Sequence, residues 1–325
     1  MKVLGIETSC DETSVALVED GRLVLAEKTI SQIPLHRTYG GVVPELAARE
    51  HALYIDQVIW DCLEEAGLNW SGVDRIAVVN GPGLVSSLMT GITAAKFLSL
   101  ALGKELVAVN HLKAHIAAVM LKEPELEPPF VCLLASGGHT QLLWVKDFAH
   151  TERIERLGQT LDDSAGEAFD KVARMLGLSY PGGPAIERLA QGGDRNAYRL
   201  PRPKLANQFD FSFSGLKTAV IRLIESLPED FCRKDLAASF QENVCLELSE
   251  KLVSAAKYSS LDKLVIAGGV AANQRLREML AIRPNYRLFA PDLKHCTDNG
   301  AMVAAAGFWC PIYSGLNFGV FAREK

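Results

Sequence analysis

Two histidines, His111 and His115, stand four residues apart in a stretch whose pattern predicts a helix. Residues i and i+4 of a helix lie one above the other on the same face. This is a spacing by which a helix offers two nitrogen ligands to one metal ion. The whole chain has only seven histidines. The pair therefore favours a metal centre over two ordinary polar or core histidines.

The residues between the two histidines limit the chemistry of such a centre. A zinc protease with the pattern His-Glu-x-x-His carries a glutamate inside the motif as its general base. Leu112, Lys113 and Ala114 stand there instead, which weakens a protease interpretation. Asp298 precedes an alanine-rich stretch. It could cap the helix that follows, or it could complete a His-His-Asp set of metal ligands with open positions for a substrate oxygen.

The composition is that of an ordinary globular protein. The chain has 325 residues, enough for two domains, and its net charge of −5 argues against general coating of nucleic acid. Its seven cysteines are scattered without a Cys-x-x-Cys pair, which indicates a reducing, cytoplasmic compartment. The start shows no secretory signal pattern. Residues 84–102 are apolar but interrupted by polar side chains, so we expect a buried helix and no membrane association.

Strand patterns occur in two similar groups. Each group begins with a strand, a short polar loop and a second strand, and later contains a strand that runs into a glycine-rich turn and a helix. The first group comprises strands at 3–8, 13–19 and 23–28, a hairpin turn at Asp20-Gly21, and the strand at 75–79; the second comprises 130–135, 141–146 and 263–267. The recurrence predicts a duplicated α/β fold.

The proline-rich segment at 122–129 is the expected boundary between the two copies. We therefore expect an N-terminal lobe at residues 1–127 and a C-terminal lobe at 128–325. Within the second lobe, residues 188–222 carry seven Lys and Arg against two Asp. This segment is interpreted as a basic insertion and as the candidate contact with a nucleic-acid backbone.

Two glycine-rich loops have the composition of a nucleotide site. Glycine lets the backbone approach a phosphate closely, and exposed N–H groups then donate to the anion. The loop from Ser136 to Thr140 fits a phosphate, and residues 268–273 fit an adenosine, with Asn273 as a hydrogen-bonding side chain. Asp170 could bind a ribose hydroxyl or an amine, and the backbone of Gly183 in a rigid turn could touch the ligand.

Asp11 and Glu12 occupy the polar loop between the first two predicted strands. A carboxylate at this position could act as a general base or orient the reacting group. The alternative is a solvated turn without a chemical role.

Taken together, these motifs identify a family. The chain resembles the bacterial TsaD family nearly from end to end. The motifs that carry the resemblance are Gly5–Ser14, Gly81-Pro82-Gly83-Leu84, His111–His115, Ser136–Thr140, Asp163–Lys171, Tyr180–Pro184, Phe211–Lys217, Gly268–Asn273 and Thr297–Met302.

The resemblance implies a duplicated fold like that of actin, sugar kinases and heat-shock chaperone ATPases, with two lobes and a nucleotide cleft between them. It implies a tRNA N6-adenosine threonylcarbamoyltransferase. Such an enzyme transfers the threonylcarbamoyl group from threonylcarbamoyl-AMP to N6 of the adenosine 3′-adjacent to the anticodon, in tRNAs that read codons starting with A, and releases AMP.

The resemblance also implies one metal ion per subunit, Fe²⁺ or Zn²⁺, on His111, His115 and Asp298. Substrate contacts are expected at Ala135, Ser136, Gly137, Gly138, His139, Asp170, Gly183 and Asn273, with Asp11 and Glu12 as candidate catalytic carboxylates. ATP, ADP or AMP would be able to occupy the cleft. The implied partners are tRNA, the paralogue TsaB in a heterodimer, and the ATPase TsaE. The apolar stripe of the helix predicted at 44–67 is a candidate docking face for TsaB.

Three other classes of protein remain as alternatives at this point. A sugar- or acetate-kinase-like phosphotransferase would use the same cleft with ATP and Mg²⁺, but leaves the paired histidines unexplained. A metalloprotease would cut a protein and be blocked by chelators. A non-catalytic nucleotide-binding scaffold would have no use for a complete set of metal ligands.

Overall fold

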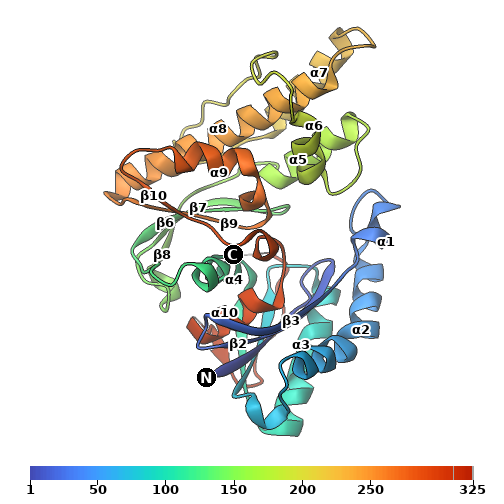
Figure 1. The fold of residues 1–325 in the computed structure, drawn as a ribbon, viewed down its shortest axis with the longest axis vertical. Coiled ribbons are helices and arrows are strands. Elements are labelled where there is room, and N and C mark those ends of the chain that lie inside the picture. The colour runs from blue at the N-terminus through green and yellow to red at the C-terminus, as the bar shows by residue number, and fades with distance from the viewer. Residues whose placement is uncertain (310, 324–325) are drawn as a thin grey trace. The chain divides into compact units, whose positions relative to one another are not determined.

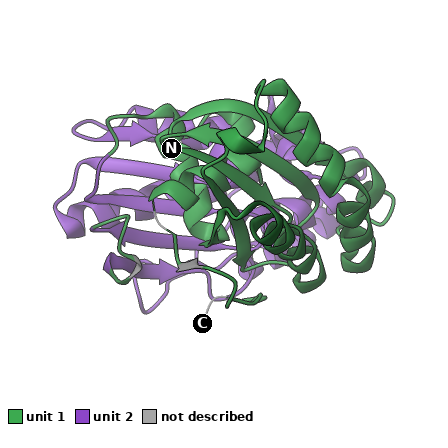
Figure 2. Cartoon of the chain, turned by 90° about the horizontal axis from the view of Figure 1, so that it is seen from below, with its two compact units in different colours: residues 1–126, 147–152, 291–325 green, residues 127–146, 153–290 purple. Residues whose placement is uncertain are grey.

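The computed structural model describes residues 1–309 and 311–323. Contacts between Cα atoms divide the chain into two compact units, coloured green and purple in Figure 2. Unit 1 comprises Met1–Leu126, Asp147–Glu152 and Pro291–Lys325; unit 2 comprises Glu127–Lys146 and Arg153–Ala290. A boundary between the two units thus lies between Leu126 and Glu127, and the segment from Pro291 onward belongs to unit 1.

Unit 1 is built on a six-stranded sheet with the order β11-β5-β4-β1-β2-β3. The strands are β1 (Lys2–Glu7), β2 (Glu12–Glu19), β3 (Leu23–Ser31), β4 (Arg75–Gly81), β5 (Glu105–Asn110) and β11 (Tyr313–Ser314). β1 pairs antiparallel with β2 and parallel with β4, β2 pairs antiparallel with β3, and β4 pairs parallel with β5. The predicted hairpin at Asp20-Gly21 is confirmed, and both residues adopt positive φ.

Helices cover the sheet of unit 1 (Figure 1). They are α1 (Ile33–Arg37), α2 (Pro44–Glu65), α3 (Val85–Leu102), α4 (His111–Lys122) and α10 (Gly300–Trp309), with short 3-10 turns at Trp70–Gly72 and Leu293–His295. α10 packs on β1, β2 and β4, α2 packs on β2 and β3, and α3 packs on β4. Because helices pack on it, seven of the eight residues of β2 are buried.

Unit 2 contains a five-stranded sheet with the order β10-β9-β6-β7-β8. Its strands are β6 (Phe130–Ala135), β7 (Thr140–Val145), β8 (Ile154–Gln159), β9 (Lys263–Ala267) and β10 (Arg287–Phe289). Its helices are α5 (Ala165–Met175), α6 (Gly182–Ala190), α7 (Ser214–Ser226), α8 (Arg233–Ser259) and α9 (Gln274–Ala281), with a 3-10 turn at Gly269–Ala272; the 3-10 turn at Thr151–Arg153 spans the boundary between the two units. The long helix α8 packs on β6, β7 and β9 (Figure 1).

The two sheets repeat one pattern. In each, the first strand pairs antiparallel with the second, the second antiparallel with the third, and the first parallel with the fourth, which in turn pairs parallel with the fifth. The order β3-β2-β1-β4-β5 of unit 1 thus matches β8-β7-β6-β9-β10 of unit 2. The predicted duplicated α/β fold is confirmed.

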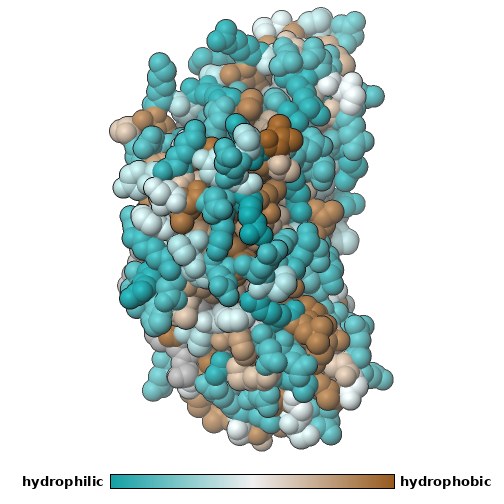
Figure 3. Space-filling model, turned by 60° about the vertical axis from the view of Figure 1, so that its left-hand side comes forward, coloured by the Kyte–Doolittle hydropathy of each residue, from teal (hydrophilic) through white to brown (hydrophobic). Residues whose placement is uncertain are grey.

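The helix predicted at residues 84–102 is present as α3, but only one of its faces is buried, through Ser87, Leu88, Gly91, Ile92 and Ala95. By length and composition α3 could cross a membrane, a test that core helices of soluble proteins also pass. Hydrophilic side chains cover most of the face drawn in Figure 3, and apolar side chains show there as separate patches.

Candidate metal centre and substrate loops

The paired histidines lie where β5 runs directly into α4. β5 ends at Asn110, and the Asn110 side chain accepts hydrogen bonds from the backbone N–H groups of Leu112 (2.9 Å) and Lys113 (3.2 Å). This cap fixes the first turn of α4 at His111. His115 follows one turn later, so both imidazoles project from the same side of the helix. The predicted helical placement of the pair is confirmed.

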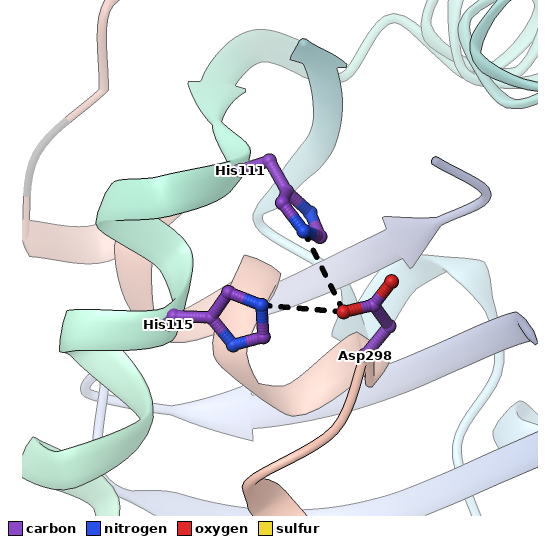
Figure 4. Close-up of side chains that lie close together, drawn as sticks. All are labelled: His111, His115 and Asp298. Atoms are coloured by element: carbon purple, nitrogen blue, oxygen red, sulfur yellow. Dashed lines mark ion pairs between the residues drawn. The ribbon is translucent and has the colours of Figure 1, made fainter. Parts of the chain in front are cut away.

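Asp298 meets this pair from the loop that precedes α10 (Figure 4). Its Oδ1 lies 3.5 Å from His111 Nε2 and 3.2 Å from His115 Nε2. The three ligand atoms all lie within 4.8 Å of one another. Asp298 is free for this role because the neighbouring Asn299 caps α10, accepting a hydrogen bond of 2.8 Å from the N–H of Met302. The alternative, that Asp298 caps the helix, is wrong.

The residues present fit a metal ion. At zinc–nitrogen distances of 2.0–2.1 Å, ligand atoms around a tetrahedral ion lie about 3.3 Å apart, close to both distances from Asp298. Both ring nitrogens of His115 are buried; Nε2 faces Asp298, and Nδ1 has no hydrogen-bond partner among the described residues. Burying an imidazole in this way is costly unless a ligand compensates it. Two imidazoles and one carboxylate are a donor set that suits zinc or ferrous iron.

A second layer of side chains orients His111. Its Nδ1 lies 3.2 Å from Glu7 Oε2 and 3.1 Å from Ser9 Oγ. Glu7 is fully buried at the end of β1 and also accepts a hydrogen bond from the N–H of Ser9. A carboxylate that accepts from Nδ1–H leaves Nε2 as the lone-pair nitrogen and makes it a better metal ligand. Neither Glu7 nor Ser9 was predicted from the sequence as part of the site.

Without a metal ion, the pKa values of His111 and Asp298 differ strongly from their ordinary values. Burial alone would lower the pKa of His111, but the carboxylates of Asp298 and Glu7 outweigh it and raise this pKa to about 9. Burial alone would raise the pKa of Asp298, but His111 and His115 outweigh it and bring this pKa to about 2. The negative charge at Asp298 therefore persists over the physiological range and would attract a cation.

Asp11 and Glu12 both lie in unit 1, in the loop and at the start of β2, and both are buried. Burial raises the pKa of Glu12 well above its ordinary value, and the charges of Asp298 and Asp11 raise it further. A carboxyl group with a raised pKa is suited to proton transfer near neutral pH. A cation beside Asp298 would offset part of this shift.

In unit 2, the predicted phosphate loop connects β6 to β7. Ala135 is the last residue of β6, and the Ser136 N–H donates to the His139 carbonyl (2.8 Å). The loop is fixed to the start of α5, since Gly166 N–H donates to the Ser136 carbonyl and Ser164 Oγ to the Gly137 carbonyl. Gly137 and Gly138 are exposed, and no atom lies within 4 Å of where a Cβ would be at either position. Their backbone is open to a ligand.

Asp170 and the glycine turn at Gly183 come together in the same unit. Asp170 Oδ1 accepts a hydrogen bond of 2.6 Å from the N–H of Gly182, the first residue of α6. A Cβ on Gly182 would lie 2.5 Å from Asp170 Cα, so this close packing requires glycine. Gly183 itself has open space beside it.

The second glycine loop lies against the first. Gly268 follows β9 with φ +86°, and a Cβ there would lie 2.5 Å from the carbonyl oxygen of Ala135. Asn273 is buried, and its Oδ1 caps α9 by accepting from the N–H of Leu276 (3.1 Å). Its Nδ2 donates to Gln241 Oε1 (3.0 Å). These contacts give Asn273 a structural role in addition to the predicted contact with substrate.

The duplicated sheets and the cluster of two histidines and an aspartate define a duplicated α/β protein with a candidate metal site. Over residues 23–305 the chain matches the family TsaD: tRNA N6-adenosine threonylcarbamoyltransferase. The chain belongs to this family and is an acyltransferase of tRNA modification, as the sequence predicted.

The sequences of related proteins match this chain over almost their full length. Proteins named tRNA N6-adenosine threonylcarbamoyltransferase are 51% identical in Gloeobacter violaceus, over 94% of this chain and 89% of that protein, and 48% identical in Thermosipho africanus, over 95% and 94%. Among solved structures, T. kodakarensis HypF matches with a TM-score of 0.64 and 15% identity, over 94% of this chain and 47% of HypF. Component A of (R)-2-hydroxyglutaryl-CoA dehydratase from Acidaminococcus fermentans matches with a TM-score of 0.54 and 13% identity, over 95% and 98%. These structural likenesses bear on the fold alone.

Proposed function

We propose that the protein transfers the threonylcarbamoyl group of threonylcarbamoyl-AMP to N6 of the adenosine 3′-adjacent to the anticodon, in tRNAs that read codons starting with A, with release of AMP. The observation that carries the proposal is the family match over residues 23–305. The cluster of His111, His115 and Asp298 adds a chemical reason. The match favours neither the phosphotransferase nor the metalloprotease alternative.

The donor is already activated, because AMP is a good leaving group. The enzyme therefore has to position two reactants and stabilise the charge that develops on oxygen. His111, His115 and Asp298 would hold one Fe²⁺ or Zn²⁺ ion, which supplies Lewis acidity when bound. Glu7 holds His111 in the tautomer that such an ion requires.

The acceptor amine must lose a proton as its nitrogen attacks the carbonyl carbon. We assign this step to the loop of Asp11 and Glu12, which orients the N6 amine and accepts its proton. The raised pKa of Glu12 supports this assignment, because it makes this carboxylate a stronger base than an ordinary glutamate.

Unit 2 would bind the adenylate. The backbone from Ala135 through Ser136, Gly137 and Gly138 to His139 would surround the phosphate, and Asp170, Gly183 and Asn273 would contact the nucleoside. The exposed, unobstructed backbone of Gly137 and Gly138 supports this role. ATP, ADP or AMP would fit the same groups, because they share the adenosine and phosphate.

The direct test is a transfer assay. Purified protein is incubated with unmodified tRNA, synthetic threonylcarbamoyl-adenylate, TsaB, TsaE and ATP, and the digested tRNA is examined by nucleoside mass spectrometry. Formation of threonylcarbamoyladenosine supports the proposal. Consumption of ATP against a small hydroxyl or carboxylate acceptor, without modified adenosine, would overturn it in favour of a phosphotransferase.

The basic segment at residues 188–222 is our candidate contact with the tRNA backbone. Arg195, Arg199 and Lys204 are exposed and form no ion pair among the described residues. Arg202 differs, because it pairs with Glu250 at 2.7 Å.

Replacing Arg195, Arg199 and Lys204 together by glutamine is expected to weaken tRNA binding and to reduce the slope of log K against log salt by about two, since each neutralised phosphate contributes about 0.7–0.9 to it. Fluorescence titration of labelled tRNA at several salt concentrations measures this slope. Arg202→Gln is the matched control and should change it less. An unchanged slope in the triple variant would mean that the segment does not contact tRNA.

The partners TsaB and TsaE complete the proposal. The apolar stripe predicted for docking is largely core, because Ile55, Val58 and Ile59 are buried. Leu53 of that stripe is exposed by more than half, and so are Trp60 on α2 and Met89, Phe97 and Leu100 on α3, which packs on α2. We assign the TsaB interface to this α2–α3 face.

The variant Leu53→Glu/Phe97→Glu is expected to elute separately from TsaB in size-exclusion chromatography, under conditions where the wild-type chain co-elutes with it. Both side chains are exposed, so the charges should not disturb the fold. Ile282→Glu, at an exposed apolar position in unit 2, is the control and should retain the complex. Co-elution of the double variant with TsaB would place the interface elsewhere.

We place the reaction in the cytoplasm. The six cysteines in the described part of the chain are all free, which suits a reducing compartment.

A further inference from the structure

A buried chain of hydrogen bonds in unit 1 leads to the loop that carries Asp11 and Glu12. Its side chains are Thr13, Gln32, His36 and His51, each at most 3% exposed. Thr13 belongs to β2, Gln32 follows β3, His36 belongs to α1 and His51 to α2. In the described part of the chain, none of these side chains forms a hydrogen bond with His111, His115 or Asp298, and the sequence motifs gave no reason to expect this hydrogen-bond network.

At one end of this series of hydrogen bonds, the contact with Cys10 determines which ring nitrogen of His51 carries hydrogen. Its Nε2 lies 3.0 Å from the carbonyl oxygen of Cys10. A carbonyl oxygen can only accept, so Nε2 carries the hydrogen. The other nitrogen, Nδ1, lies 2.7 Å from Thr13 Oγ1 and 3.3 Å from Gln32 Nε2.

At the other end of the series, the hydrogen bonds of His36 lead independently to the same position of hydrogen on His51. The N–H of Val43 donates to His36 Nδ1 (3.3 Å), so this nitrogen carries no hydrogen and His36 Nε2–H donates to Gln32 Oε1 (3.1 Å). The remaining end of the Gln32 amide is its NH₂ group, which donates to His51 Nδ1. The donors and acceptors assigned from Cys10 agree with those assigned from Val43. Both His36 and His51 are therefore neutral, with hydrogen on Nε2.

The charges around His51 are consistent with this form. Burial lowers the pKa of His51. The Cys10 carbonyl and the carboxylates of Glu7 and Asp11 act in the opposite direction, but burial prevails. His51 therefore accepts and donates as a neutral ring at physiological pH.

The bonds hold the loop at three successive points. His51 binds the Cys10 carbonyl, the N–H of Gln32 donates to the Asp11 carbonyl (2.8 Å), and the Thr13 hydroxyl binds His51 Nδ1. Asp11 and Glu12 lie inside this clamp. The backbone from which both carboxyl groups project is therefore held on either side.

We propose that His51, in its neutral form with hydrogen on Nε2, is a positioning residue that sets the Cys10–Thr13 loop and thereby the carboxyl groups of Asp11 and Glu12. This inference rests on the proposed function, in which that loop handles the acceptor amine. Gln32 and His36 contribute by fixing which ring nitrogen of His51 donates.

Two conservative variants distinguish the role of Nε2 of His51 from that of Nδ1. Glutamine places an amide N–H near Nε2 and can still donate to Cys10, whereas asparagine places its polar atoms near Nδ1 and cannot reach Cys10. His51→Asn is expected to lower kcat by about 10- to 100-fold, the cost of a reacting group misplaced by a fraction of an ångström to one ångström. KM for tRNA and the bound metal should be unchanged. His51→Gln should stay close to wild type in kcat.

Equal losses of kcat in both variants, or a loss confined to KM, would overturn the proposal. A second measurement does not depend on transfer activity: ¹⁵N NMR of the histidine-labelled wild-type protein should show His51 neutral, with Nε2 protonated and Nδ1 bare. A charged ring, or hydrogen on Nδ1, would also overturn it. If wild-type protein transferred nothing while the NMR result held, the proposed function would fail and the hydrogen-bond chain would stand.

Discussion

Replacing His115 by alanine is expected to remove the bound metal ion and about 10³-fold of threonylcarbamoyl transfer. The variant leaves one imidazole and one carboxylate, too few protein ligands for tight binding. A Lewis acid contributes several kcal/mol to the stabilisation of developing charge, and each 1.36 kcal/mol is tenfold in rate. Metal content by mass spectrometry of the purified protein and modified nucleoside by the transfer assay measure the two losses separately.

The control for this prediction is His150→Ala, since His150 is exposed and pairs only with Asp147 among the described residues. It should keep both the metal and the activity. A His115→Ala protein that contains no metal but transfers at the wild-type rate would show that the cluster has no part in the reaction. Thermal unfolding of both variants establishes that each is folded.

Gly300→Ala is expected to destabilise the protein by about 3 kcal/mol, at the upper end of the usual cost of overpacking. A Cβ at this position would lie 2.4 Å from Ala16 N and 2.5 Å from Val15 C, both in the backbone of β2. Neither the strand nor the first turn of α10 can yield locally, because the N–H of Gly300 donates to Ser14 Oγ at 2.8 Å. α10 must therefore shift and carry Asp298 with it, so bound metal should fall as well.

Urea unfolding gives the change in stability, and metal analysis gives the change at the site. Gly215→Ala is the matched control, because Gly215 lies in the first turn of α7 with nothing within 4 Å of the added methyl group. It should be neutral or slightly stabilising. A stable Gly300→Ala protein with full metal content would show that α10 tolerates displacement from β2.

The sequence predicted those features that depend on residues close together along the chain. The spacing of His111 and His115 predicted their helix and common face because one turn of helix determines both. The recurrence of strand and loop patterns predicted the duplicated fold. The choice between capping and metal binding at Asp298 stayed open, because Asp298 and Asn299 are both good capping residues and only the structure shows that Asn299 takes the cap.

Residues outside the motifs were missed for a different reason. Glu7 ends an apolar strand, and its role arises only because α4, more than 100 residues later, presents His111 to it. His51 lies in the helix predicted at 44–67, and its partners come from β2, from the β1–β2 loop and from Gln32 after β3. Long-range neighbours of this kind are set by sheet order, which the sequence pattern does not specify. The predicted boundary between lobes at residue 127 likewise gave no sign that residues 291–325 group with the first unit.

The return of the chain to unit 1 after residue 290 has a consequence for synthesis on the ribosome. His111 emerges early, but Asp298 and the helix that packs on β1, β2 and β4 are made only after the whole of unit 2. At 5–20 residues per second, the nascent chain exposes an uncovered sheet and two unpaired metal ligands for roughly 10–35 s. A metal ion that needs all three side chains could therefore be captured only after Asp298 and α10 have been made.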